Sequence, residues 1–346
     1  MGALEKATPR VDETPQEETL VAALEKATPE RATAPKNPIH CGLIVGRPHQ
    51  TERLEVRYAS PDSWERFDVR LVLKDPTKGC FDPAEPGTDA GRDWLEVVLR
   101  PAGGGEWRLR LPAYAAHLVD PTTLYEIEDV GSDALSTFWS DGTWSGSLVW
   151  DAAVHVTEEM LGTELGERMR GTSVLELACG LGLPGLTAHC LGASRVVLSD
   201  RGQVVGLVEE GLRANRAALS GGGRPVPVAA VLDWGSAAAR ELLQQRLGGS
   251  QPDWIIACDC IFESLFGSTD GVTSIFLLLR VLELLCSPTT RVLVGLERRT
   301  GDGAEKFLAA AEGAGFVASL RRRHGRVVIF EMGRARMPRA HADGAT

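Results

Sequence analysis

The sequence has no apolar stretch long enough to cross a bilayer. Residues 275–285 form a short apolar run, but it contains Arg280 and Glu283. The amino terminus has no apolar signal core and carries many glutamates, so we expect neither a secretory signal nor a transit peptide. We therefore expect a cytoplasmic protein that does not bind membranes, and a nuclear location stays open.

Metal-ligand spacing is also missing among the seven cysteines. Cys258 and Cys260 alternate along a predicted strand, so their side chains should point to opposite faces. The odd number and the scatter of the cysteines predict free thiols in a reducing compartment. We expect no metal site.

Positive charge is scarce. The chain has 37 Lys and Arg against 47 Asp and Glu, a net charge of −10, which argues against nucleic acid as a partner. Residues 321–326, with Arg334, Arg336 and Arg339, are the basic exception. We expect a solvated hairpin and tail there, and a docking patch for an acidic partner is the alternative.

The first third of the chain differs from the rest. Residues 1–38 are rich in Ala, Glu, Lys, Thr and Pro and repeat one heptamer, and they predict a disordered segment. Residues 39–130 predict a small β-rich accessory region, which either recognises substrate or covers the main domain. Its expected strands lie at 42–45, 66–73, 94–99 and 107–111.

An α/β pattern covers residues 131–334, and residues 335–346 predict a flexible tail. Strands are expected at 173–178, 195–200, 226–233, 253–259, 291–297, 316–320 and 327–332. Helices are expected at 151–165, 184–192, 203–218, 236–246, 271–286 and 303–314. Alternation of this kind predicts a parallel sheet, and the short link before the seventh strand makes that strand antiparallel to its neighbours.

A glycine-rich turn follows the first of these strands. Gly180, Gly182 and Gly185 have the GxGxxG spacing, and Asp200 ends the next strand. Glycines let the backbone approach a nucleotide, and the carboxylate can accept hydrogen bonds from ribose hydroxyls. Dinucleotides and S-adenosylmethionine both use such a pocket.

Glu176 helps to choose between these two ligands. It lies within the first strand, just before the turn. An acid there can hold the cationic amino-acid end of S-adenosylmethionine, whereas a nicotinamide cofactor has no such ammonium group. The alternative is a carboxylate that caps a neighbouring loop.

Two further motifs follow later strands. Asp233 and Trp234 can hydrogen-bond and stack on adenine, although Trp234 could instead plug the sheet edge. Asp259 and Phe262 suit an amine nucleophile, because a carboxylate can orient nitrogen and a ring can contact a cationic chain. An ordinary loop carboxylate is the alternative for Asp259. Upstream, Trp150 could line the methionine end of the pocket.

Together these motifs resemble the seven-strand protein methyltransferases called methyltransferase family 16. The matching segments are 149–153, 175–185, Asp200, 232–235, 259–262 and 297–299. The resemblance implies a Rossmann-like fold, S-adenosylmethionine as cofactor, and methyl transfer to a lysine of a protein substrate. We also expect a monomer.

By this resemblance six residues would contact the cofactor, namely Trp150, Gly180, Gly182, Asp200, Trp234 and Cys258. The arguments given above add Glu176 and Asp233 to the expected cofactor-binding residues. Asp259 and Phe262 would lie beside the target nitrogen. Two positions depart from the family: Ala178 replaces the first glycine of the turn, and Phe262 replaces a tyrosine.

Other functions remain open at this point. A histidine or a small molecule could accept the methyl group, and a catalytically silent scaffold could keep the pocket. A nicotinamide-dependent oxidoreductase is less favoured, because no convincing Lys, Tyr or His constellation for hydride transfer is present.

Overall fold

The structure is a computed structural model of the 346-residue chain. It describes residues 19–27, 44–45, 54–56, 67–72, 93–113, 146, 149–261, 268–269, 272–299 and 301–335.

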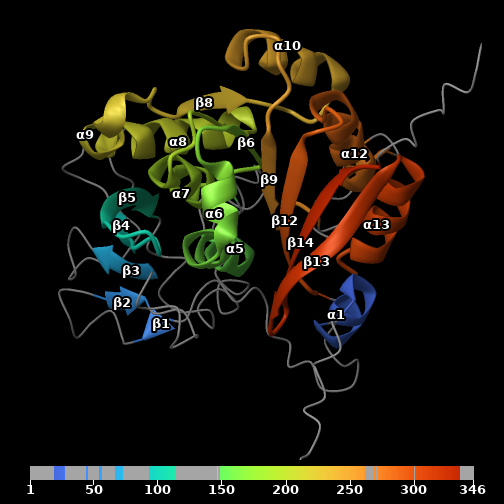
Figure 1. The fold of residues 1–346 in the computed structure, drawn as a ribbon, viewed down its shortest axis with the longest axis horizontal. Helices are drawn as coiled ribbons and strands as arrows, with labels where there is room; N and C mark the ends of the chain where they lie inside the picture. The colour runs from blue at the N-terminus through green and yellow to red at the C-terminus, as the bar shows by residue number, and fades with distance from the viewer. Residues whose placement is uncertain are drawn as a thin grey trace, which may run out of the picture.

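A seven-stranded sheet organises most of the described chain (Figure 1). Its strands are β6 (Ser173–Leu177), β7 (Arg195–Asp200), β8 (Val228–Val231), β9 (Trp254–Cys258), β12 (Arg291–Glu297), β13 (Phe316–His324) and β14 (Val327–Arg334). Their order is β13-β14-β12-β9-β6-β7-β8, and the pairs from β12 to β8 are parallel. Strand β14 pairs antiparallel with β12 and β13, so the predicted Rossmann-like sheet with an antiparallel last strand is confirmed.

Helices cover both faces of this sheet (Figure 1). The helices on one face are α5 (Asp151–Gly162), α6 (Glu164–Met169), α7 (Leu183–Leu191) and α8 (Gly202–Ala214). The helices on the other face are α1 (Leu20–Ala27), α10 (Ser236–Arg246), α12 (Ser274–Leu285) and α13 (Ala304–Gly313). An apolar core lies on each face of the sheet. Val174 and Leu175, neighbours in β6, pack into different cores because side chains alternate along a strand.

Capping residues set helix boundaries that differ from the predicted ones. The helix expected at 151–165 is interrupted at Thr163, whose hydroxyl accepts the N–H of Leu165 and starts α6. The helix expected at 271–286 begins only at Ser274, because Thr273 caps it and the preceding residues form a short hairpin. That hairpin consists of β10 (Ser268–Thr269) and β11 (Val272–Thr273).

The predicted β-rich region forms a second, antiparallel sheet. Its strands are β1 (Ile44–Val45), β2 (Leu54–Val56), β3 (Phe67–Val72), β4 (Asp93–Leu99) and β5 (Trp107–Ala113), paired in chain order. Strand β2 is absent from the sequence prediction. Leu95, Leu99 and Leu111 enter the same apolar core as α5, α7 and α8, so the two sheets share one core.

Asn215 fixes the second sheet to the main domain. Its side chain accepts the N–H of Arg110 at 2.7 Å and donates to the Arg110 carbonyl at 2.6 Å. Asn215 also ends α8, so the helix predicted at 203–218 is divided into α8 and α9 (Arg216–Leu219), which a 3-10 turn follows at Gly221–Gly223.

The prediction of disorder across residues 1–38 is wrong for one segment. Residues 20–27 form helix α1, which contacts β13 and β14 (Figure 1). Ala23 and Leu24 are buried in the core on that face, so burial of apolar side chains stabilises a helix that the local composition does not favour. The rest of that segment, the stretch around residue 130 and the tail from 336 lie outside the described residues.

A candidate cofactor and substrate site

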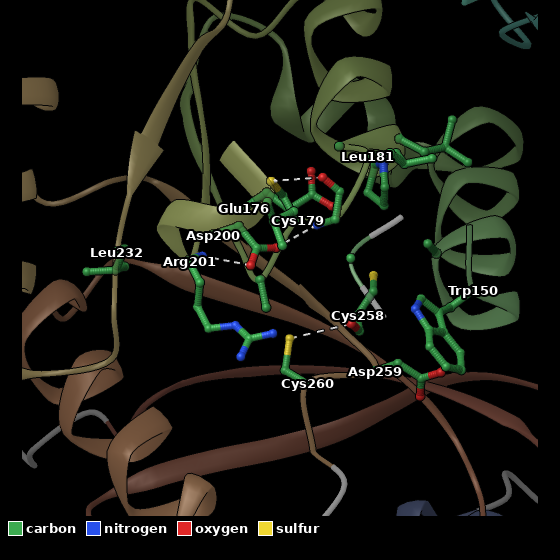
Figure 2. A pocket seen from close by; sticks show the side chains of 18 of the residues that line it. Trp150, Glu176, Cys179, Leu181, Asp200, Arg201, Leu232, Cys258, Asp259 and Cys260 are labelled. Carbon is green, nitrogen blue, oxygen red and sulfur yellow. Dashed lines mark hydrogen bonds between the residues drawn. The ribbon is translucent and has the colours of Figure 1, made fainter. Parts of the chain in front are cut away.

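A cavity of about 510 Å³ lies at the carboxyl edge of the main sheet. All the residues expected to bind the cofactor line it: Trp150, Glu176, Gly180, Gly182, Asp200, Asp233, Trp234 and Cys258. Asp259 lines it as well. Figure 2 shows Trp150 and Asp259 together on one side of the cavity, with Glu176 and Asp200 on the other. Sequence positions more than 100 residues apart therefore meet at one site, where α/β folds bind ligands.

Asp200 joins two loops at the end of β7. Its Oδ2 accepts the N–H of Gly180 at 2.8 Å, and its Oδ1 accepts the N–H of Arg201 at 2.7 Å (Figure 2). Burial raises the pKa of Asp200, while the two backbone N–H groups act in the opposite direction. The carboxylate therefore holds the glycine turn in place and still faces the cavity.

Glu176 is the most deeply buried acid of the site, at 1% exposure. Its Oε2 accepts the N–H of Gly185, at the start of α7, at 2.8 Å. Burial raises its pKa to about 8, and the nearby charge of Asp200 acts in the same direction. No basic side chain in the described part of the chain pairs with it, so a cationic ligand group would complete its environment.

The glycine turn has left-handed backbone at three positions. Gly180 and Gly182 have φ values of 52° and 76°, which glycine adopts without strain. Ala178 has a φ of 46°, where a Cβ costs about 1–2 kcal/mol. Ala178 therefore strains the turn at one of its three left-handed positions.

Asp259 also has left-handed backbone, with a φ of 52°. Its N–H donates to the Gly295 carbonyl at 2.9 Å, and its Oδ1 accepts the N–H of Glu297 at 2.9 Å. These bonds to β12 hold the carboxylate at the cavity wall. Aspartate tolerates this conformation better than most residues do.

Arg299 links Asp259 to two further side chains. Its Nη2 donates to Asp259 Oδ2 at 2.9 Å and also to Glu297 Oε2. Its guanidinium lies over the Trp150 ring, with 5.2 Å between Cζ and the ring centroid. Burial raises the pKa of Glu297 to about 7, although the charge of Arg299 opposes this rise. The arrangement is a cation held by two carboxylates and an aromatic face.

Comparison with known proteins identifies the family of this chain. The model of a family described as lysine methyltransferase matches residues 132–314, more than half of the chain. The protein belongs to this lysine methyltransferase family.

Three relatives are similar in sequence to part of this protein. Secreted RxLR effector protein 48 of Plasmopara viticola is 39% identical over 140 residues, which are 38% of this chain and 66% of the relative. Protein N-terminal and lysine N-methyltransferase EFM7 of Yarrowia lipolytica is 32% identical over 190 residues, 50% of this chain and 64% of the relative. Protein N-lysine methyltransferase METTL21A of Mus musculus is 32% identical over 158 residues, which are 44% of this chain and 61% of the relative. Each match spans less than two thirds of the relative's own length.

The roles that the sequence analysis assigned to individual site residues remain predictions. Phe262, expected beside the target nitrogen, lies outside the described residues. Among the residues that the structure does describe, no group of three or more His, Cys, Asp or Glu could hold a metal ion. None of the described helices is long and apolar enough to span a membrane.

Some residues at the cavity were not predicted from the sequence. Arg201, Ser274 and Leu277 line it, and the buried Oγ of Ser274 has no hydrogen-bond partner among the described residues. Arg299 was noted only as part of a family motif, without a role. Its contacts with Asp259 and Trp150 join segments 40 and 149 positions away, and no local signal predicts such contacts.

Proposed function

We propose that this protein is an S-adenosylmethionine-dependent protein N-methyltransferase that transfers a methyl group to a lysine side chain. The observation that carries the proposal is Glu176, a buried carboxyl group that pairs with no basic side chain among the described residues and faces the same cavity as Asp200. A cationic nucleoside-like ligand matches this pair: ribose hydroxyls suit Asp200, and an ammonium group suits Glu176. Membership of the lysine methyltransferase family supports the same function.

The residues of the cavity fit this cofactor. Glu176 and the turn at Gly180 and Gly182 would hold its amino-acid end, Asp200 its ribose, and Asp233 with Trp234 its adenine. Ser274 offers a buried hydroxyl that has no partner among the described residues. When bound, S-adenosylmethionine supplies an electrophilic methyl group; a nicotinamide cofactor would leave Glu176 without a counter-charge.

The target amine must lose a proton before its lone pair can react. A free lysine has a pKa of about 10.4, so its deprotonation at pH 7 costs roughly 4–5 kcal/mol. An isolated carboxylate beside the amine would increase this cost, because it favours the ammonium form. In the protein without substrate, the guanidinium of Arg299 lies 2.9 Å from Asp259. Asp259 can orient the nitrogen through a hydrogen bond, while burial excludes competing water.

The partner that we infer is a protein presenting a lysine, and we propose a monomeric, cytoplasmic enzyme. Two of the three relatives described above carry lysine N-methyltransferase in their names, which supports a protein acceptor. The net charge of −10 does not favour nucleic acid as a substrate.

The test is transfer of labelled methyl groups from S-adenosylmethionine into a hypomethylated cell extract. We expect a discrete protein band whose label maps to lysine and disappears with Asp259→Asn. Asparagine tolerates the left-handed backbone of this position and keeps an oxygen for the N–H of Glu297, so the fold should be retained. Glu241→Gln on the exposed face of α10 is the control and should label the same band as the unchanged chain.

Binding of S-adenosylhomocysteine, measured by calorimetry, separates the outcomes. Asp259→Asn should keep this affinity within a few-fold, because the residue is assigned to the amine and not to the cofactor. Label on histidine or on a small molecule would replace the lysine assignment. Binding without any transfer would favour a silent scaffold.

A further inference from the structure

Three residues at the wall of the cavity, Asp259, Arg299 and Trp150, form a site for a cation together with Glu297 beside them. Asp259 and Glu297 each bind the same guanidinium nitrogen of Arg299, and the Trp150 ring lies against the guanidinium at 5.2 Å. The side chains of Arg299 and of both acids are 11%, 4% and 4% exposed. Two buried carboxylates and an aromatic face are the groups that recognise ammonium and guanidinium ions.

Arg299 occupies this site from within the protein. Arg299, Asp259 and Trp150 all line the cavity that is proposed to hold the cofactor. In the proposed reaction the target amine has to reach Asp259, and the Arg299 guanidinium lies there at hydrogen-bond distance. An amine and this guanidinium therefore compete for one carboxylate oxygen.

The two partners of this ion pair differ in their freedom to move. The backbone N–H of Asp259 bonds to Gly295 and its Oδ1 to Glu297, so the carboxylate is fixed to β12. Arg299 has a long side chain that follows the end of the strand. Displacement of the guanidinium therefore requires only side-chain rotation, whereas displacement of Asp259 would break backbone hydrogen bonds.

Glu297 can retain the arginine after such a displacement. Its Oε2 already accepts from Arg299, and its Oε1 lies 4.0 Å from the Arg326 guanidinium. If an ammonium takes the place at Asp259, each carboxylate keeps one cation. No charge is then left buried without a partner, so the exchange avoids the free-energy cost of an unpaired charge in a buried site.

We propose that Arg299 is a specificity gate, which fills the cation site at Asp259 and Trp150 until the cationic side chain of a substrate displaces it towards Glu297. The proposal rests on the proposed function, because it assigns the entering group to the methyl acceptor. Neutral side chains of the same length cannot replace the charge of the guanidinium at Asp259. The gate therefore selects for amines such as lysine against apolar or amide side chains.

Removal of the gate should expose the site to small cations. We would titrate n-butylammonium, and n-butanol as the neutral analogue, into the full chain saturated with S-adenosylhomocysteine, with calorimetry as the readout. Arg299→Ala should bind n-butylammonium about tenfold or more tightly than the unchanged chain, and n-butanol no more tightly. Arg299→Lys should again exclude n-butylammonium, because the ammonium group of the lysine fills the same site.

Further variants test the two carboxylates and the background. Asp259→Asn combined with Arg299→Ala should lose the gained affinity. Glu297→Gln alone should weaken n-butylammonium binding relative to the unchanged chain, because the displaced arginine then has no carboxylate to receive it. Arg322→Ala removes an arginine that is 53% exposed and pairs with Glu159, and it should change nothing.

Two results would overturn the gate. One is an Arg299→Ala protein that binds n-butylammonium no better than the unchanged chain, and the other is equal gains for n-butylammonium and n-butanol. S-adenosylhomocysteine binding reports that each variant is folded, and Arg299→Gln replaces the alanine variant if that one fails this check. Methyl transfer by the unchanged chain in the extract assay would still support the proposed function if the gate fails, so the two failures are distinguishable.

Discussion

The N–H of Gly185 donates to the carboxylate of Glu176 at 2.8 Å, and this contact brings the start of α7 against β6. No side chain fits at the glycine. A Cβ there would lie 2.3 Å from Leu198 Cδ2 and 2.6 Å from Glu176 Oε2. The third glycine of the motif is therefore required by helix–strand packing and not by contact with a ligand.

Gly185→Ala should lower the free energy of unfolding by about 1–3 kcal/mol, because the methyl group overpacks Leu198 and Glu176. Gly206→Ala is the matched control, since nothing lies within 4 Å of a Cβ at that exposed position of α8. It should instead raise the free energy of unfolding by about 0.5–1 kcal/mol. Urea titration of both variants measures the difference, and equal effects would contradict this packing argument.

Ala178→Gly should stabilise the protein, although glycine is normally the less stable choice. Left-handed backbone at Ala178 costs about 1–2 kcal/mol, and the greater freedom of an unfolded glycine offsets roughly half of this. We expect a net gain of about 0.5–1 kcal/mol in the free energy of unfolding. Ala309→Gly, on the exposed side of α13, should lower the same quantity by about 1 kcal/mol. A loss at both positions would mean that the turn at Ala178 is not strained.

The sequence predicted the main sheet because its signals are local. The first six apolar strands alternate with helices, and the acids at 176, 200 and 259 lie at or near strand ends. Parallel crossovers bring such ends to one edge, so residues recognised separately line one cavity. A hairpin before Val327 also required an antiparallel seventh strand.

Long-range contacts explain what the sequence did not reveal. The insertion of β14 between β12 and β13 depends on pairing across the whole sheet, and no property of β14 itself specifies it. Asn215 ends a helix because its amide binds Arg110, which lies 105 positions earlier in the chain. The ion pair between Asp259 and Arg299 likewise follows from adjacency of β9 and β12, which only the folded sheet defines.

Binding of S-adenosylhomocysteine should release a proton. Burial raises the pKa of Glu176 to about 8 in the free protein, so the group is largely protonated at pH 7. The ligand's ammonium favours the carboxylate and lowers this pKa, and affinity should therefore rise by up to about tenfold per pH unit between pH 6 and 8. Calorimetry in two buffers of different ionisation enthalpy counts the proton, and Glu176→Gln should abolish its release.

Glu176 also makes stability depend on pH. Stability falls as the pH rises, whereas the affinity for S-adenosylhomocysteine increases. Because the pKa of Glu176 in the folded protein exceeds the ordinary value of 4.5, its contribution to folding is complete below pH 4.5 and is lost as the pH rises through about 8. Without ligand, the melting temperature of the unchanged chain should fall between pH 5 and 8 more steeply than that of Glu176→Gln. Parallel curves for the two proteins would contradict the raised pKa.

Leu24→Ala tests whether α1 is part of the folded domain. Leu24 is 2% exposed within the core that β13 and β14 contribute to, so its truncation should lower the free energy of unfolding by about 2–4 kcal/mol. Val21 lies on the same helix at 63% exposure, and Val21→Ala should change the free energy of unfolding by less than about 0.5 kcal/mol. Urea titration distinguishes the two variants. Equal and small effects would contradict the packing of α1 on the sheet.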